Sequence, residues 1–287
     1  MPRTEEAQRS FPVQWEELTA SDFPEAVERS KGVCVVPIGV IEKHGPHLPL
    51  GTDVIAARAI SVRAAEQEYA VVLPSYWFGQ IFEAKHRPGC IALRESLLTP
   101  LLQGVCDEIA RNGFGKILIV NGHGGNNSWL NYFTQIQLDL RREYVVYVVS
   151  AEGFIKDDAL LREVQTRRKA TGEAHAGEVE TSVIMAIRPE LVQIQRTGEE
   201  DAQAQGRLKH LRGVTTGIWW YADFPNHYAG DAQKASAELG ERVLEAAAAG
   251  LADVIGAVKE DTAAARLQDQ FFIQAEDPLG PQRAETR

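Results

Sequence analysis

Three short polar segments of this sequence combine histidine with carboxylate side chains. The first holds Glu42, His44 and Asp53, the second holds His123, and the third holds His175, Glu178 and Glu180. Imidazole and carboxylate together are ligands for zinc or manganese, whereas calcium and magnesium favour oxygen alone and copper or iron–sulfur sites need cysteine. These residue types therefore indicate a hydrolytic metal centre.

The first segment holds two potential ligands that lie two residues apart. On an extended chain, side chains at i and i+2 point the same way, so Glu42 and His44 can both reach a metal from one short stretch. Asp53 begins the next expected helix, where the N-terminal amides can orient its carboxylate and its two oxygens can bridge neighbouring ions. His47 has the same ligand chemistry, but a Gly-Pro turn before it redirects the chain, so a structural role is the commoner expectation.

The third segment, from His175 to Ser182, places three ionisable groups at the entry to an expected helix. For any one of these polar residues alone, a helix cap or a solvated face is the better interpretation. Their glycine and small neighbours, however, let the backbone approach a ligand closely. The concentration of histidines in polar, glycine-rich loops favours a shared site, since five of the seven lie there: His44, His47, His86, His123 and His175.

Two of the polar segments follow directly on stretches that predict buried strands. Val33 to Gly39 runs into Glu42 and His44, and Lys116 to Val120 runs into His123. In open parallel sheets the ligand site lies beyond the carboxyl ends of the strands, where loops from different strand–helix units converge. Both segments should therefore open onto the same edge of one sheet.

The rest of the chain alternates short β-branched runs with longer segments of helical period, which predicts parallel strands crossed over by helices. The other expected strands are Ala70 to Leu73 and Tyr144 to Val149. The expected helices are Asp53 to Glu68, a stripe from Leu98 to Ile109 that ends at Asn112-Gly113, a segment from Trp129 to Leu140, a short helix from Val179 to Ala186 and a long one from Gln233 to Val258.

Two later segments permit more than one interpretation. The aromatic residues between Trp219 and Tyr228 form either an ordered loop packed on the core or on a subunit, or an aromatic wall that faces the substrate. Residues 262–287 are polar and contain two prolines. We therefore expect a single domain over residues 1–261, followed by a polar C-terminal tail that is flexible or docked on a partner.

Composition excludes several classes of protein. A chain of 287 residues with 44% hydrophobic content can bury a substantial core, and its net charge of −10 gives no attraction to nucleic acid or to anionic membranes. No run of eighteen apolar residues predicts a membrane span, and the start of the chain has no apolar signal-peptide core, so we expect a cytoplasmic location. The three cysteines form no CxxC pair and predict neither a disulfide framework nor a zinc knuckle.

Taken together, the polar segments resemble those of the creatininase family. Its members carry a Glu-x-His-Gly-x-His-Leu-Pro-x-x-Thr-Asp segment, an Asn-Gly-His-Gly-Gly-Asn segment and a His-Ala-Gly-x-x-Glu-Thr-Ser segment. All three occur here in that order between Glu42 and Ser182, and the set is more specific than any one motif. The resemblance implies an α/β fold, a three-layer α/β/α sandwich with a mostly parallel, doubly wound sheet, and assembly as a homohexamer.

The same resemblance implies a set of ligands and a mechanism. Two divalent metal ions per subunit, zinc, manganese or one of each, would supply a bridging hydroxide that attacks a C–N amide bond of a small molecule. His175 or Glu178 would carry a proton to the leaving nitrogen. The ligands would be Glu42 and His123 on one ion, His44 and Glu180 on the other, and Asp53 between the two.

Four further residues are candidates for substrate contact: His86, Arg87, Gly125 and Glu152. The first two belong to a loop similar to a His-Phe-Pro-Gly loop of the family, although Arg87 could equally form a surface salt bridge. Gly125 stands where creatinine-hydrolysing members have a catalytic glutamate, and Glu152 and Thr171 stand where they have tryptophans. Creatinine is therefore a poor candidate substrate, because each missing aromatic contact removes about 0.5–1.5 kcal/mol of stacking on a planar ring.

Other activities stay open at this point. Some members of the family deformylate pyrimidine-derived intermediates or trim modified peptides, so a metallopeptidase-like activity is one alternative, and a non-catalytic, metal-stabilised binding subunit is another. The basic run from Arg167 to Lys169 could accept an acidic substrate or could be a solvated helix face. A dinucleotide-binding protein is excluded, because the Asn121 to Asn127 loop lacks GxGxxG spacing.

Overall fold

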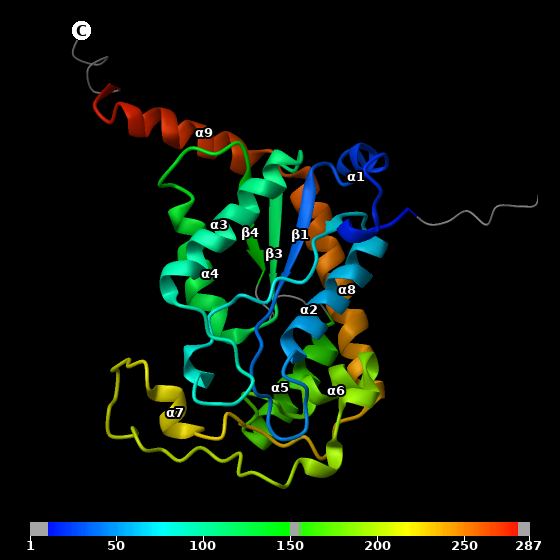
Figure 1. Ribbon diagram of the computed structural model, residues 1–287, viewed down its shortest axis with the longest axis vertical. Coiled ribbons are helices and arrows are strands. Elements are labelled where there is room, and N and C mark those ends of the chain that lie inside the picture. Colours follow the sequence, from blue (N-terminus) through cyan, green and yellow to red (C-terminus); the bar gives the residue numbers. More distant parts are fainter. Residues whose placement is uncertain (1–10, 150–154, 156, 281–287) are drawn as a thin grey trace, which may run out of the picture.

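The computed structural model describes residues 11–149, 155 and 157–280, and at its centre lies a four-stranded sheet (Figure 1). The strands are β1 (Val33–Ile38), β2 (Val71–Val72), β3 (Lys116–Asn121) and β4 (Val145–Val149). They lie in the order β2-β1-β3-β4, and every neighbouring pair is parallel. The four strands predicted from the sequence are confirmed.

The sheet is buried on both faces, which explains why its strands are continuous apolar runs. In β1, Val33 and Val35 point into one core, while Cys34 and Val36 point into the other. Cys34 and Cys106 pack in this second core as free cysteines.

Helices cover both faces of the sheet (Figure 1). One face packs against α2 (Thr52–Gln67), α5 (Asp158–Thr171), α6 (Glu178–Ile187) and α8 (Ala237–Glu260), and the other against α1 (Phe23–Arg29), α3 (Glu95–Arg111) and α4 (Asn127–Ile136). The chain first steps from β1 outward to β2 and then crosses back to β3, so its winding reverses between β1 and β3. The expected three-layer, doubly wound sandwich is confirmed.

Helices α6 and α8 pack against each other so closely that one position must be glycine. A Cβ atom added at Gly240 in α8 would stand 1.9 Å from the backbone oxygen of Ser182 in α6. Ser236 caps α8, because its hydroxyl accepts a hydrogen bond from the amide of Leu239, and its own amide donates to the Ser182 hydroxyl at 3.0 Å. The cap explains why the helix begins at Ala237, four residues later than its composition predicts.

Shorter helical turns connect these layers. They are η1 (Trp15–Glu17), η2 (Phe82–Ala84), η3 (Gly124–Asn126), η5 (Pro189–Leu191), η6 (Ile194–Arg196) and α7 (Trp219–Asp223). Helix α7 lies at one end of the molecule, next to long loops (Figure 1). The aromatic segment that the sequence singles out therefore contains a short helix.

The C-terminal segment differs from the expected tail, because it begins with a helix. Helix α9 (Ala263–Glu276) projects at the end of the molecule opposite to α7 (Figure 1). It is attached through the buried Phe272 and through Gln268, whose side-chain amide donates to the backbone carbonyls of Arg142 and Tyr144. The helix itself was not predicted from the polar composition, while docking of this segment on a partner stays a prediction.

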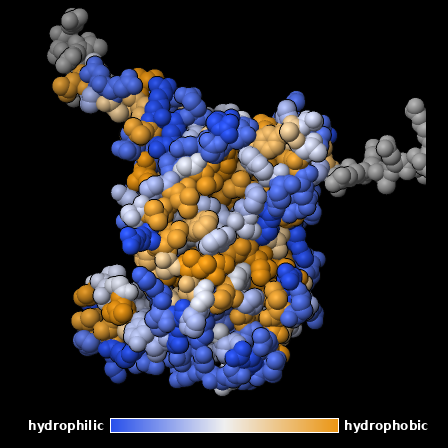
Figure 2. Space-filling view, viewed as in Figure 1, coloured by the Kyte–Doolittle hydropathy of each residue, from blue (hydrophilic) through white to orange (hydrophobic). Residues whose placement is uncertain are grey.

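Exposed apolar residues gather on the surface beside α3 and α4. On the face shown in Figure 2, hydrophobic residues gather towards the middle and hydrophilic residues surround them. Exposed leucines lie on α3 and just after α4, and a groove of about 390 Å³ runs beside α3: the leucines are Leu97, Leu101, Leu138 and Leu140. Within the described part of the chain, no helix combines the length and apolarity needed to cross a membrane.

Candidate metal centre

A cavity of about 460 Å³ opens where β1 and β3 end, at the point where the winding of the sheet reverses. Two glycines let the N-terminus of α2 approach both strands. A Cβ atom at Gly39 would stand 2.6 Å from the amide nitrogen of Val54, and one at Gly122 would stand 2.9 Å from the carbonyl oxygen of Asp53. Asp53, in the first turn of α2, is thereby brought to the loops that follow the two strands.

The cluster at the base of this cavity is built around Asp53. His123 Nδ1 lies 2.8 Å from Glu42 Oε1 and 3.1 Å from Asp53 Oδ2. The turn that carries His123 is held by Asn121 at the end of β3, whose side chain bonds both the amide and the carbonyl of His123. Glu42, Asp53 and His123 are buried, and they form one of the groups that could hold a metal ion.

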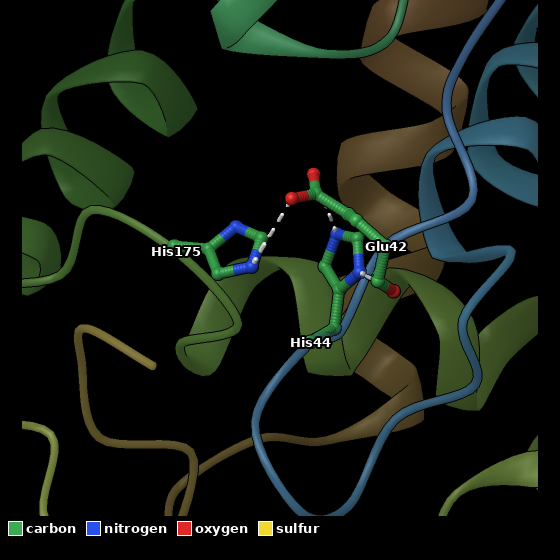
Figure 3. A group of neighbouring side chains, drawn as sticks. All are labelled: Glu42, His44 and His175. Atoms are coloured by element: carbon green, nitrogen blue, oxygen red, sulfur yellow. Dashed lines mark hydrogen bonds and ion pairs between the residues drawn. The ribbon is translucent and has the colours of Figure 1, made fainter. Parts of the chain in front are cut away.

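His44 and His175 form a second group with Glu42 (Figure 3). His44 Nδ1 donates to the backbone carbonyl of Glu42 at 3.2 Å, which leaves Nε2 to face Asp53 Oδ1 at 2.9 Å. His175 Nε2 donates to the carbonyl of Lys43 at 2.8 Å, and its ring centre lies 4.3 Å from that of His44. The two groups share Glu42, so they are parts of one continuous site.

Glu180 lines the same cavity from the first turn of α6, and its carboxylate accepts a hydrogen bond from the amide of Ala176 at 2.6 Å. It lies outside both three-residue groups, although its charge acts on His44. The structure thus brings together all five ligands implied by the resemblance. It also places His175 within ligand distance of Glu42 and His44, a position that the resemblance reserves for Glu180.

The charges of the cluster balance one another. Burial raises the pKa of Glu42, but the positive charges of His123 and His175 outweigh burial and hold that pKa well below its ordinary value. Burial lowers the pKa of His44, but the negative charges of Asp53 and Glu42 outweigh burial and raise that pKa to about 9. Burial also lowers the pKa of His123, but Glu42 and Asp53 again outweigh it and hold that pKa well above its ordinary value. The site attracts positive charge, so a divalent cation could replace the imidazole protons.

Unsatisfied atoms support a cation at this place. Three potential ligand atoms are buried and make no hydrogen bond within the described residues: Glu42 Oε1 and Asp53 Oδ2, which lie within ion-pair distance of His123 Nδ1, and His123 Nε2. Buried polar atoms are nearly always paired, because leaving one unpaired costs about 1–3 kcal/mol. The donor set of imidazoles and carboxylates suits zinc or manganese, so the residues fit the group that they are expected to hold.

Two residues that line the cavity were not predicted from the sequence. Glu83, from η2, reaches over Gly125: a Cβ atom at Gly125 would stand 2.8 Å from Glu83 Oε1 and 2.4 Å from His123 Nε2. Glu173 also lines the cavity, and burial, with the nearby charge of Glu180, raises its pKa to about 7. Neither glutamate belongs to a recognisable motif, so no local signal could have identified them.

His227 is the other residue that the sequence did not reveal. It is buried, and its Nε2 forms a hydrogen bond with Glu42 Oε2. Trp220 Nε1 donates to His227 Nδ1 at 2.8 Å, and Trp219 and Trp220 both line the cavity. The aromatic segment therefore supplies a wall of the site, while its last member, Tyr228, is buried against His47 as the packing interpretation expects.

Several predicted residues lie away from the cavity wall. Glu178 is buried and paired with Arg167 on α5. His86 Nε2 donates to the carbonyl of Pro225, and Arg87 bonds that carbonyl and the side chain of Asn226. His86 and Arg87 thus hold the loop before His227 in place, and Arg87 makes no salt bridge with the residues described.

The other predicted contacts have mixed outcomes. Gly125 and Arg168 line the cavity. Glu152 lies outside the described residues. His47, whose ligation was the less favoured expectation, bonds the Thr181 hydroxyl at 2.9 Å, and burial followed by the charge of His44 lowers its pKa to about 4. His47 therefore has the structural role that its position after the Gly-Pro turn predicts.

Comparison with known proteins agrees with this geometry. A family model described as creatininase, creatinine amidohydrolase, matches residues 16–255. The chain is 29% identical over 258 residues to creatinine amidohydrolase of Pseudomonas putida, covering 83% of this chain and 94% of the relative. It is 30% identical over 162 residues to the mycofactocin precursor peptide peptidase of Mycolicibacterium smegmatis, covering 54% and 58%. The structure of a mutant creatininase of Zn-Zn type superimposes with a TM-score of 0.74 and is 26% identical, covering 88% of this chain and 100% of that one. The structure of a manganese form of creatininase superimposes with a TM-score of 0.72 and is 25% identical, with the same coverage of both chains.

Proposed function

Because the chain belongs to the creatininase family, we propose that it is a binuclear-metal amidohydrolase that cleaves a C–N amide bond of a small molecule. The observation that carries the proposal is the buried cluster of imidazoles and carboxylates, in which three ligand atoms make no hydrogen bond within the described residues. We assign the ions to Glu42 and His123 on one side, His44 and Glu180 on the other, and Asp53 between them. When bound, zinc or manganese would polarise the amide carbonyl and acidify a water molecule.

The chain's own residues would move the proton. His175 Nε2 is engaged as a donor to the carbonyl of Lys43, so Nδ1 is the ring nitrogen that can accept a proton and pass it to the leaving nitrogen. Glu178, the other predicted catalytic residue, is paired with Arg167 and does not line the cavity. We therefore assign the proton transfer to His175. A positioned acid or base of this kind contributes about 10²- to 10⁴-fold to the rate.

The walls of the cavity indicate what kind of amide would fit. A volume of about 460 Å³ is within the usual range for small-molecule sites. Trp219 and Trp220 offer aromatic surface, while Glu83, Glu173 and Arg168 offer polar contacts. Because Gly125 has no side chain, the Glu83 carboxylate can occupy the space beside His123. The polar groups around a substrate would therefore differ from those of creatinine-hydrolysing relatives.

A second candidate function is the trimming of a modified peptide. The mycofactocin precursor peptide peptidases are about as similar to this chain as the creatinine amidohydrolase is, although they align over less of it. The cavity is also open to solvent beside Trp219, whose side chain is 54% exposed. A longer substrate could extend past this indole.

We also propose that the protein assembles as a homo-oligomer, as the family resemblance implies. The exposed leucines of α3 and of the segment after α4 provide an apolar surface for such contacts (Figure 2). Light scattering on the purified protein tests this directly. A monomer at micromolar concentration would contradict the hexamer.

The function itself is tested with metal-depleted protein. Calorimetric titration with zinc or manganese should show two bound ions per chain, and the loaded protein should hydrolyse at least one compound in a panel of cyclic amides, formamides and short peptides. Glu42→Gln should lose both properties, while His210→Ala, at an exposed histidine, should keep both. Metal binding without turnover would identify the non-catalytic binding subunit, and absence of metal binding would refute the proposal.

A further inference from the structure

His227 lies between the aromatic wall and a predicted metal ligand. Its imidazole is only 2% exposed. On one side, Trp220 Nε1 donates to Nδ1 at 2.8 Å, and on the other, Nε2 bonds Glu42 Oε2. Glu42 is 185 residues distant in the sequence, so this contact joins the loop after α7 to the loop after β1.

The two hydrogen bonds together fix the tautomer of His227. The indole nitrogen of tryptophan is a donor only, so Nδ1 of His227 must accept. In a neutral imidazole the proton then resides on Nε2, which donates it to the Glu42 carboxylate. This bond occupies Oε2 of Glu42 and leaves Oε1, which has no hydrogen-bond partner, beside His123 Nδ1 at 2.8 Å.

The backbone at His227 shows that this placement has a cost. Its φ angle is +53°, in the left-handed region that side chains with a Cβ atom rarely adopt. The conformation is held by a hydrogen bond from the amide of His227 to the carbonyl of Phe224 at 2.9 Å. Strained residues of this kind persist where the surroundings over-determine them, and they concentrate at functional sites.

We propose that His227 is a positioning residue that turns one oxygen of the Glu42 carboxylate towards the metal ions, and that Trp220 keeps His227 in the tautomer required. The inference deepens the proposed function and rests on it, since it assumes that Glu42 binds metal. Outer partners of this kind orient the ligand and typically account for 10- to 100-fold in metal affinity. Trp220 also lines the cavity, so the same indole would contact the substrate and fix the hydrogen bond that orients the ligand.

The test compares zinc affinity among variants by competition with a chromophoric chelator. His227→Ala should weaken zinc binding by about 10- to 100-fold. His227→Gln should stay within about threefold of the parent, because the terminal amide nitrogen of glutamine can donate from near the position of Nε2. His210→Ala is the matched control in the same irregular segment, and its affinity should be unchanged.

The outcomes separate this inference from the proposed function. If the parent protein binds no zinc, the proposed function fails first. If the parent binds zinc and folded His227→Ala binds it equally well, or if the alanine and glutamine variants weaken it equally, the positioning role is overturned. Should His227→Ala fail to fold, Trp220→Phe keeps the aromatic ring but frees the tautomer. It should weaken zinc binding severalfold, and an unchanged affinity would overturn the proposed role of Trp220 and, with it, the positioning of Glu42 through His227.

Discussion

Replacing Gly240 by alanine should push helix α8 away from helix α6. The added Cβ would stand 1.9 Å from the oxygen and 2.4 Å from the carbonyl carbon of Ser182, whereas ordinary van der Waals contact begins at 3.4 Å. The helices must therefore separate locally by about 1.5 Å, the difference between 1.9 and 3.4 Å. Because the opposing atoms belong to the backbone, no side-chain rotation can relieve the clash.

The size of the effect follows from two opposing contributions. Alanine in a helix interior is favoured over glycine by about 1 kcal/mol. Overpacking costs typically about 1–3 kcal/mol and more when the backbone must move, and separation also loosens contacts between buried side chains such as Val183 and Leu244. Taking the upper end of the overpacking cost, about 3 kcal/mol, and subtracting about 1 kcal/mol for alanine, we expect a net loss of about 2 kcal/mol in the free energy of unfolding, equivalent to roughly 4–8 °C in Tm.

Urea unfolding of metal-depleted protein measures the change, and Gly256→Ala provides the control in the same helix. The nearest atom to a Cβ at Gly256 is Glu68 Cγ at 3.9 Å, so this variant should gain about 0.5–1 kcal/mol. Gly240→Ala should also weaken zinc binding, because α6 carries Glu180. If Gly240→Ala proved as stable as Gly256→Ala, the close packing of α6 on α8 would be refuted.

Three further predictions test the site and the domain limits. Gly125→Ala should weaken zinc binding about tenfold or more in a chelator competition, because its Cβ would lie 2.4 Å from His123 Nε2, whereas Gly124→Ala, with no atom within 4 Å, should not. Burial and, to a lesser extent, the charge of His44 lower the pKa of His47 to about 4. The folded protein therefore binds a proton at His47 less readily than the unfolded chain does. The stability that His47 contributes above about pH 6.5 should be lost as the pH falls towards 4. His47→Gln should flatten that part of the urea-unfolding profile, and an unchanged slope would contradict the assignment. Truncation after Asp261 should cost about 1.5–3 kcal/mol through the loss of buried Phe272 and leave zinc affinity intact, so a weakened affinity would show that residues 1–261 are not the whole functional domain.

Local patterns in the sequence predicted the framework of the fold well. Strands β1 and β3 are short runs of mostly buried apolar residues, and burial on both faces leaves no polar alternation to obscure them. The segments after β1 and β3 were expected to meet because parallel strands end at one edge, and Glu42 does lie beside His123. These inferences needed only neighbouring residues and one rule of sheet geometry.

The parts that were missed depend on contacts between distant residues. His227 bonds Glu42 across 185 positions, and nothing near it in the sequence signals a site. Helix α9 begins at Ala263, after a Thr262 whose side chain does not cap it, and it shows just one buried residue, Phe272, so its sequence gives a weak helical signal. Glu178 was expected to carry a proton to the leaving nitrogen, but on α6 its carboxylate pairs with Arg167.

The proposed ligands and the aromatic wall come from different parts of the chain, and this separation has a practical consequence. The five proposed ligands come from the loops and helix ends that the layered body holds, whereas the two indoles and their imidazole partner arrive together on one stretch of chain. Exchanging that stretch for the equivalent one of a relative could redirect selectivity while the cation pair is retained. Such chimeras would offer a route to new amidases on this scaffold, provided that a group able to donate to Glu42 is kept in the graft.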